Sequence, residues 1–338
     1  MADAVTPVAR ERGWRRLLPA LLLFLILPAI PHLRMLAPVE LTHFLLVPAI
    51  AACALAGWWA GGRASIAFVW LGLAAWMAWF GAGAAPPMVN LAKGWGVVLG
   101  AAFGLVCVLG AGRPFFARAL TATAIAMLVG VGAAAFSSGG VSRLGRIHGA
   151  ELDRRVVSAT TGLQALERTR EWQDFSTRNP GAAGLRNEAE RQLRFVGEAS
   201  RIAFPALLAL ESLAALALAW GVFHRISRTR IGPALAPLRE FRFNDQLVWG
   251  LVVGTAAVVV PQLRELRGVG INLLVFFGAL YLMRGLGVLT WFLAPGRLVT
   301  VLLIGFAVIA WPLFGVFALG LGLGDTWLDW RSRPRPTT

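Results

Sequence analysis

The sequence is poor in charged residues, and its positive charge comes almost entirely from arginine. Only 14% of the 338 residues are charged and 57% are apolar, whereas a soluble domain carries about 25% charged residues. Lys93 is the only lysine. Such a composition cannot surround one water-facing core, so lipid must form part of the solvent. The sequence therefore predicts an integral membrane protein.

Cysteine is also scarce, which excludes a disulfide framework. Cys53 and Cys107 both lie inside apolar runs, where small packing residues are expected. The net charge of +15 would suit nucleic acid, but the arginines lie in the tails, at the ends of apolar runs and in one polar segment. That distribution orients a protein in a membrane, whereas nucleic-acid binding needs a basic face. We expect no nucleic-acid partner, no metal and no cofactor.

Nine apolar runs follow one another along the chain. They lie at about 17–33, 40–60, 64–82, 94–112, 115–136, 202–224, 246–263, 269–293 and 299–323. At about 20 residues per span, they predict an all-α polytopic bundle of eight or nine transmembrane helices, with eight if one of the first two runs does not cross. The arginines of the short loops favour a cytoplasmic N-terminus in a bacterial cell membrane. The side of the C-terminus stays open, because it depends on the count.

A polar segment interrupts these runs at residues 137–201. It holds eleven arginines and eight acidic residues between Arg143 and Arg201. Apolar residues recur in it at helical spacing, and Asn179-Pro180-Gly181 breaks it in two. The pattern predicts a helical hairpin whose second arm continues into the next span. Two interpretations stay open: a solvated insert packed on the bundle, or an element that docks a partner.

The polar insert divides the chain into parts. These are N-terminal spans at 1–136, the hairpin insert at 137–201, C-terminal spans at 202–331 and a tail at 332–338.

Polar residues inside apolar runs are the candidates for function. An ionisable group at the centre of a membrane helix costs at least about 2.5–3.5 kcal/mol, and Glu211 and Arg284 lie deep in two runs. Asn272 and Tyr281, the only tyrosine, lie on related faces of the run that holds Arg284. These four residues either line a solute-binding pocket or hold helices together, with Glu211 and Arg284 as an ion pair.

The last run ends in a second charged motif, formed by Asp325, Asp329 and Arg331. Aspartates four residues apart share one face of a helix. They could hold a divalent cation with phosphates, but no further acidic cluster accompanies them. An interfacial terminus anchored by Trp327, Trp330 and Arg331 is the favoured interpretation. The chain lacks a zinc-protease HExxH, a phosphate-binding loop and a GxSxG elbow, so we predict no catalytic residue.

Motifs of the C-terminal third resemble a known family. They are Gly270-Ile-Asn272, Tyr281-Leu-Met-Arg284-Gly285 and Gly322-Leu-Gly324-Asp325-Thr-Trp-Leu-Asp329-Trp-Arg331. Over about residues 240–331 the chain resembles the YybS-like membrane proteins, which are grouped by distant similarity with the S components of energy-coupling-factor transporters. Arg284 stands where that family leads us to expect glutamine. The resemblance implies a helical bundle that binds a small solute on its outer side and docks on a membrane protein partner.

These features favour a small-solute-binding or transport-related membrane protein, in contact with the lipid bilayer, a small-molecule solute and a membrane protein partner. The alternative is a non-catalytic scaffold or assembly factor that recruits partners through the 141–200 hairpin.

Overall fold

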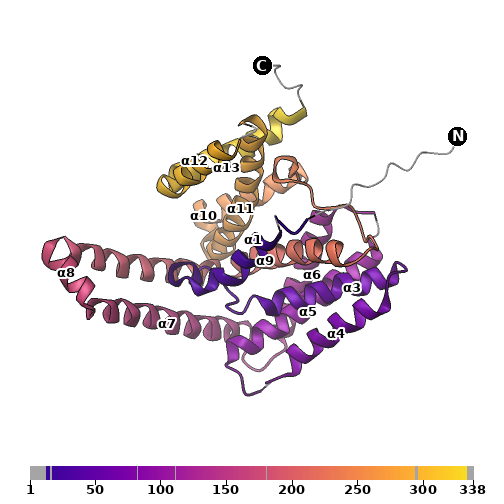
Figure 1. The fold of residues 1–338 in the computed structure, drawn as a ribbon, viewed down its shortest axis with the longest axis horizontal. Helices are drawn as coiled ribbons and strands as arrows, with labels where there is room; N and C mark the ends of the chain where they lie inside the picture. Colours follow the sequence, from indigo (N-terminus) through magenta and orange to yellow (C-terminus); the bar gives the residue numbers. More distant parts are fainter. Residues whose placement is uncertain are drawn as a thin grey trace. The chain divides into compact units, whose positions relative to one another are not determined.

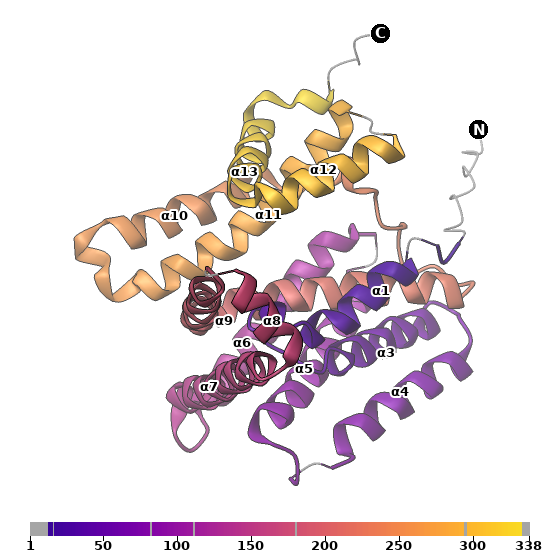
Figure 2. The same cartoon turned by 60° about the vertical axis from the view of Figure 1, so that its left-hand side comes forward.

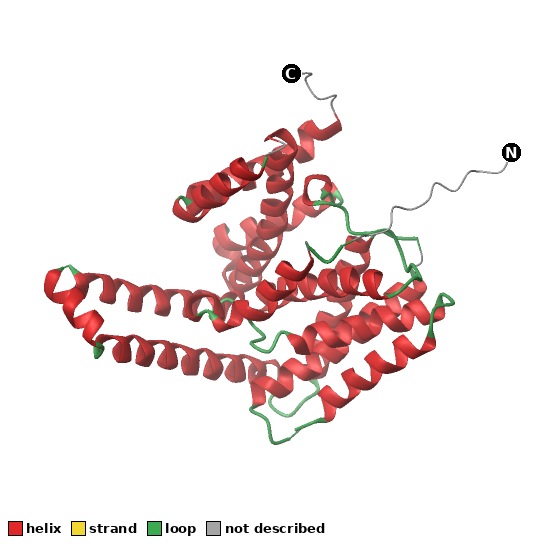
Figure 3. Cartoon of the chain, viewed as in Figure 1, coloured by secondary structure: helices red, strands yellow, loops and turns green. Residues whose placement is uncertain are grey.

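The computed structural model describes residues 13–15, 17–81, 83–110, 112–179, 181–293 and 296–332. Within these ranges the chain forms helices, turns and loops, and no strand (Figure 3). The predicted all-α class is confirmed. Contacts divide the chain into a first unit, Met1–Ala234, and a second unit, Leu235–Thr338. The run at 202–224, which the sequence pattern groups with the C-terminal spans, belongs to the first unit.

The first unit is built around α3. Its helices are α1 (Leu17–Ile26), α2 (Pro31–Arg34), α3 (His43–Trp59), α4 (Ala64–Trp79), α5 (Pro87–Leu109), α6 (Phe115–Ala135), α7 (Gly140–Glu167), α8 (Arg170–Arg178) and α9 (Ala182–Ile226), with a 3-10 turn, η1, at Leu27–Ala29. Helix α3 packs against α4, α5 and α9. Leu45, Ala49 and Cys53 have no exposed surface. A helix that is apolar on all sides is suited to such a central position.

Glycines allow α5 to approach α3 closely. A Cβ on Gly96 would overlap the carbonyl oxygen of Phe44, and one on Gly100 would come within 2.9 Å of the carbonyl oxygen of Pro48. Gly96 and Gly100 are four residues apart, so they lie on one face of α5. Close contact through small residues is a common way of packing helices in membranes.

A helical hairpin extends from this core (Figure 1). Its arms are α7 and the first part of α9, which lie side by side, and α8 connects them at the tip (Figures 1 and 2). Leu152 and Leu193 are buried within it, and Arg201 pairs with Asp153 at 2.6 Å. Helix α9 continues without interruption for 45 residues, from the polar arm into the apolar core.

The second unit is centred on α11. Its elements are η2 (Leu238–Glu240), η3 (Asp245–Leu247), α10 (Val248–Val259), η4 (Pro261–Leu266), α11 (Arg267–Leu293), α12 (Arg297–Ile309), α13 (Trp311–Leu328) and η5 (Trp330–Ser332). Helix α11 packs against α10 and α13. Glycines again mark the crossings, because a Cβ on Gly285 would overlap the carbonyl oxygen of Ala318, and one on Gly322 that of Tyr281.

The eight or nine spans expected from hydropathy are not confirmed. In the described ranges, four helices are long and apolar enough to cross a membrane, or five if the bent pair of α12 and α13 forms one span. The four occupy Pro87–Leu109, Phe115–Ala135, Gly184–Ile226 and Pro261–Leu293. The apolar helices α1, α3, α4 and α10 have 10 to 17 residues. At a rise of about 1.5 Å per residue, they fall short of a hydrocarbon core about 30 Å thick.

Candidate functional site

Arg284 lies in α11 and is almost fully buried, as its place in an apolar run predicts. Its Nε donates to Oδ2 of Asp325 at 2.8 Å, and its Nη1 donates to Oδ1 of Asp245 at 2.6 Å. Its Nη2 donates to the backbone oxygen of Asp325 at 3.2 Å. The guanidinium also lies 5.3 Å from the centre of the Phe243 ring, at cation–π distance. All three nitrogens of Arg284 are therefore engaged within its own unit.

Asp325 is shared between two arginines. Nη2 of Arg331 donates to its Oδ2 at 2.6 Å, so both guanidinium groups meet on one carboxylate. Nη1 of Arg331 also donates to the backbone oxygens of Arg239 and Phe241, at 3.1 and 3.0 Å. Together with Asp245, the cluster contains two positive and two negative side chains. It fastens the segment before α10 to α11 and to the end of α13, and we call it the closed cluster.

Asp329 does not share a helix face with Asp325, contrary to the prediction. Helix α13 ends at Leu328, and Asp329 adopts a left-handed conformation with φ of 37°. Aspartate tolerates this conformation better than most residues. Its carboxylate pairs with Arg242 at 2.9 Å, while that of Asp325 points to arginines. Among the described residues, no three histidine, cysteine or acidic side chains gather as metal ligands.

Tyr281 and Asn272 occupy different surroundings along α11. The Tyr281 side chain has no exposed surface and packs edge-on against Phe243, with the ring centres 5.0 Å apart. Asn272 is half-buried, and its Nδ2 donates to the backbone oxygen of Gly268, one turn earlier, at 2.8 Å. Tyr281 thus packs beside the closed cluster, whereas Asn272 bonds to its own helix.

Glu211 lies in α9 of the first unit. Its Oε2 accepts the backbone N–H of Val39 at 3.0 Å. Val39 belongs to the segment between α2 and α3, so Glu211 holds this segment against α9. Glu211 and Arg284 each find their contacts within their own unit, and neither residue lines the large pocket of the first unit.

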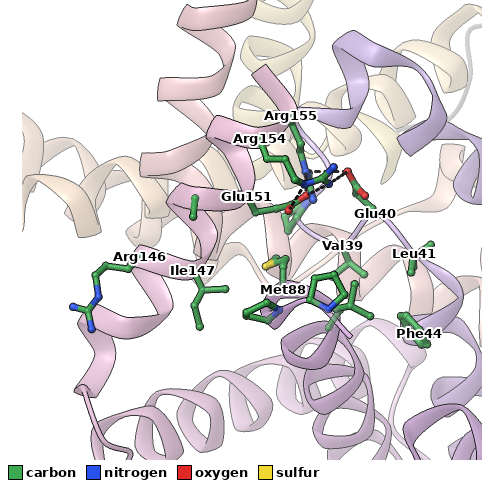
Figure 4. Close-up of a pocket in the computed structure, with 16 residues that line it drawn as sticks. Val39, Glu40, Leu41, Phe44, Met88, Arg146, Ile147, Glu151, Arg154 and Arg155 are labelled. Carbon is green, nitrogen blue, oxygen red and sulfur yellow. Dashed lines mark hydrogen bonds and ion pairs between the residues drawn. The ribbon is translucent and has the colours of Figure 1, made fainter. Parts of the chain in front are cut away.

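That pocket lies beside residues 146–155 of α7, which we call the foot of α7, and has a volume of about 620 Å³. Its walls come from three segments that are distant in the sequence: residues 38–44, residues 86–92 and the face of α7 between Arg146 and Arg155. Phe44, Met88 and Ile147 contribute apolar surface (Figure 4). Ligand sites in proteins have volumes of about 300–1,000 Å³ and combine apolar walls with a few polar groups, so the size and lining suit a small molecule.

Arg155 anchors one wall of the pocket. Its side chain is 1% exposed, and its Nε lies 2.9 Å from Glu151 and 3.1 Å from Glu40. Its Nη1 donates to the backbone oxygens of Arg34 and Ala37, at 2.8 and 2.7 Å. A buried arginine with several acceptors fixes the segments that it joins. Arg155 therefore ties α7 to the segment that Glu211 holds from the other side.

Arg154 lies at the rim of the same pocket and is 54% exposed. Its Nε donates to Glu151 at 2.9 Å, and its Nη2 lies 3.4 Å from Glu40. Burial raises the pKa of Glu151, but hydrogen bonds from Arg154 and Arg155 outweigh it and bring this pKa below its usual value. Glu151 is therefore a carboxylate at neutral pH. Figure 4 shows Glu40, Glu151, Arg154 and Arg155 meeting on one side of the pocket; we call them the open cluster.

The sequence prediction missed the open cluster, although one signal could have revealed it. Glu40 is the only acidic residue between Glu11 and Glu151. An isolated carboxylate at the edge of an apolar run needs a partner, and Arg154-Arg155 follow Glu151 at the three- and four-residue spacings that place charges together on a helix. What the sequence does not give is the proximity of Glu40 to these residues.

One comparison with known proteins identifies the family. The family model for predicted membrane proteins called DUF2232 matches residues 20–326. The chain belongs to the DUF2232 family. No curated protein and no solved structure matches it. The DUF2232 match begins in α1 and ends in α13, so it spans both units. It does not show the resemblance to YybS-like proteins or S components, which stays a prediction.

Proposed function

We propose that this protein binds a small solute in the membrane, and that the site is the pocket at the foot of α7. The pocket itself carries the proposal, because about 620 Å³ of space lies between apolar walls and the open cluster. A transport-related role, like that implied by the resemblance to S components, fits a membrane protein that holds its solute in this way. The activity of the DUF2232 family is not established, so the proposal rests on the site.

The closed cluster is a weaker candidate than the sequence suggested. Arg284 and Arg331 are 4% and 3% exposed, and both share Asp325. A solute at Arg284 would have to displace Asp325 or Asp245. Breaking a buried ion pair costs about 3–5 kcal/mol, which a small solute would have to recover. The pocket in the first unit needs no such displacement.

Glu211 keeps a role in this proposal as a positioning residue. Val39 lines the pocket, and its backbone N–H is bound by Glu211. Helix α9 therefore holds the pocket wall from behind. Through Glu211, a movement of α9 would displace Val39 and change the shape of the pocket wall. A transport cycle needs such coupling between helix movement and the binding site.

Small molecules that copurify with the detergent-solubilised protein provide the test. Ala150 lines the pocket, so Ala150→Trp would fill part of it. Ala165 lies on the same helix, is exposed and is not among the pocket residues, so Ala165→Trp is the matched control. Mass spectrometry should find a molecule with the wild type and A165W that is lost from A150W. Identical small-molecule profiles for all three proteins would refute the site.

A scaffold function is the second candidate, and the surface of the hairpin favours it. Leu185 and Phe195 lie on the second arm and are 62% and 74% exposed. They are ten residues apart, so at about 3.6 residues per turn they lie roughly 80° from one another around α9, on adjoining faces. Apolar side chains that gather into an exposed patch mark surfaces that contact another protein.

The double substitution Leu185→Ser and Phe195→Ser separates the two functions, since neither residue lines the pocket. A scaffold would lose copurifying proteins and keep its small-molecule profile. A solute-binding protein would keep both. The A150W variant should show the opposite pattern, with proteins retained and the small molecule lost.

A further inference from the structure

The pocket at the foot of α7 has two chemically different sides. Figure 4 shows the open cluster at one side and Leu41, Phe44 and Met88 away from it. The other apolar lining comes from the same two segments, 38–44 and 86–92, and from Ile147 and Ala150 of α7. A solute that matches both sides must carry a polar head and a substantial apolar body.

The charged side carries an excess of positive charge. Arg154 and Arg155 lie on this side with two acids, Glu40 and Glu151, whereas the side chain of Arg146 extends away from them (Figure 4). Arg34 adds a further cation, since it pairs with Glu40. The carboxyl group of Glu211 lies behind the wall, on the backbone of Val39, and does not line the pocket. With Arg34, this side holds three cations against two carboxylates, which favours an anionic head group.

Arg154 is the arginine best placed to receive that head group. Arg155 is buried and holds the wall, and the side chain of Arg146 extends away from the open cluster (Figure 4). Arg154 is half-exposed, and its Nε and Nη2 donate to Glu151 and Glu40. Within the described residues, its Nη1 has no acceptor. A guanidinium with donors at a pocket rim is suited to a carboxylate or phosphate.

We propose that the solute is a single-chain amphipathic anion, with a carboxylate or phosphate-monoester head on Arg154 and an apolar chain over Phe44 and Met88. This inference rests on the proposed solute-binding function and names its substrate class. A small hydrophilic anion would leave the apolar walls exposed to water. A neutral amphiphile would offer Nη1 of Arg154 only an uncharged acceptor, without the charge-assisted hydrogen bond that a carboxylate or phosphate accepts. The single-chain anion satisfies both sides of the pocket.

Three probes distinguish these possibilities in native mass spectrometry of the whole protein, released from a neutral detergent. They are dodecyl phosphate, which has both head and chain, dodecanol, which lacks the charge, and inorganic phosphate, which lacks the chain. We expect dodecyl phosphate to bind at least about tenfold more tightly than either of the others. Equal binding of dodecanol and dodecyl phosphate would overturn the proposal, as would tight binding of inorganic phosphate.

Substitution of Arg154 then locates the head group. Arg154→Gln should weaken dodecyl phosphate binding by about tenfold, while Arg154→Lys, which keeps the charge, should lose less. The control is Arg191→Gln, because Arg191 is 75% exposed, pairs with Glu188 on the second arm and does not line the pocket. An equal loss in R154Q and R191Q, or no loss in R154Q, would contradict the assignment.

Failure of this inference and failure of the proposed function give different results. If A150W removes a copurifying neutral molecule while dodecyl phosphate does not bind, the pocket binds a solute of another class. If A150W changes nothing and no probe binds, solute binding at the pocket is itself wrong.

Discussion

Both units hold arginines against carboxylates, but the two clusters differ in what remains for a ligand. In the closed cluster, Arg284 and Arg331 are buried and converge on Asp325. In the open cluster, Arg155 is equally buried, yet Arg154 beside it stays 54% exposed at the rim of a large pocket. The contrast teaches that a buried charge in an apolar helix is not by itself a sign of a binding site. What matters is whether other side chains of the protein already satisfy that charge, or whether a donor or acceptor stays open to a ligand.

The largest effect is expected where the closed cluster is broken. Asp325→Ala would leave two buried arginines without their shared carboxylate, at a cost of about 3–5 kcal/mol. Thermal unfolding in detergent should show a large loss of stability. Asp329→Asn is the control, because the Asp329–Arg242 pair is about half exposed and surface pairs contribute about 0–1 kcal/mol. Similar losses for D325A and D329N would show that the cluster does not clamp the second unit.

Within the open cluster, the two neighbouring arginines should behave differently. Arg155→Ala removes the donor to Glu151, Glu40 and two backbone oxygens, and should destabilise the protein by about 3 kcal/mol. Arg154→Ala removes a half-exposed ion pair and should cost less than about 1 kcal/mol of stability. The same substitution should weaken binding of the solute. Unfolding and ligand binding, measured together on both variants, check this division. Equal effects on stability would mean that Arg154 is structural too.

The glycine contact of the second unit gives an effect of intermediate size. A Cβ on Gly285 would overlap the backbone of α13, whereas one on Gly278, in the same helix, would meet nothing within 4 Å. Gly285→Ala should therefore destabilise by about 1–3 kcal/mol. Gly278→Ala should leave stability equal or raise it by up to about 1 kcal/mol. Melting temperatures that move in the same direction would argue against close packing of α11 on α13.

The smallest expected effect is the pH dependence of stability caused by His148, which lies near the open cluster. Burial, followed by the charge of Arg155, lowers the pKa of His148 from 6.5 to about 4, and its ring packs on Phe204 at 3.8 Å. The unfolded chain then binds a proton between pH 4 and 6.5 that the folded protein does not, so stability falls as pH decreases through this window. From pH 7 to 5.5 the loss should be about 1 kcal/mol.

Comparison of the wild type with His148→Phe over pH 5.5–7 isolates this contribution. Glu151, whose pKa is lowered, affects stability only below its ordinary value of 4.5. The variant should show a flatter pH dependence. An unchanged slope would mean that burial does not lower the pKa of His148 in the folded protein.

The class of the fold follows from the sequence, but the number of spans does not. Long apolar runs and helical periodicity predict an all-α membrane protein, and the structure agrees. Hydropathy measures composition and does not show where a helix ends. Helix α3 ends before Gly61, which has φ of +82°, and α4 begins soon after. Two short helices therefore occupy runs that look long enough to cross.

The candidate site shows a similar division. Arg284 and Asp325 could be singled out because each is charged in or beside an apolar run, and both are buried. Their pairing joins residues 41 positions apart, and sequence spacing carries no information on such a contact. The pocket is harder still to predict, because Glu40, Met88 and Arg154 come from three distant segments. The isolation of Glu40 and the spacing of Arg154-Arg155 after Glu151 are the hints that the sequence offers.

The continuity of α9 has a mechanical consequence. At about 1.5 Å per residue, its 45 residues make one helix of nearly 70 Å, with Pro205 inside it. The tip of the hairpin is at one end, and Glu211, with its grip on Val39, is about two thirds of the way along. A displacement of α8 would therefore reach the pocket wall along one helix, and Pro205, six residues before Glu211, is the place where that helix bends most easily.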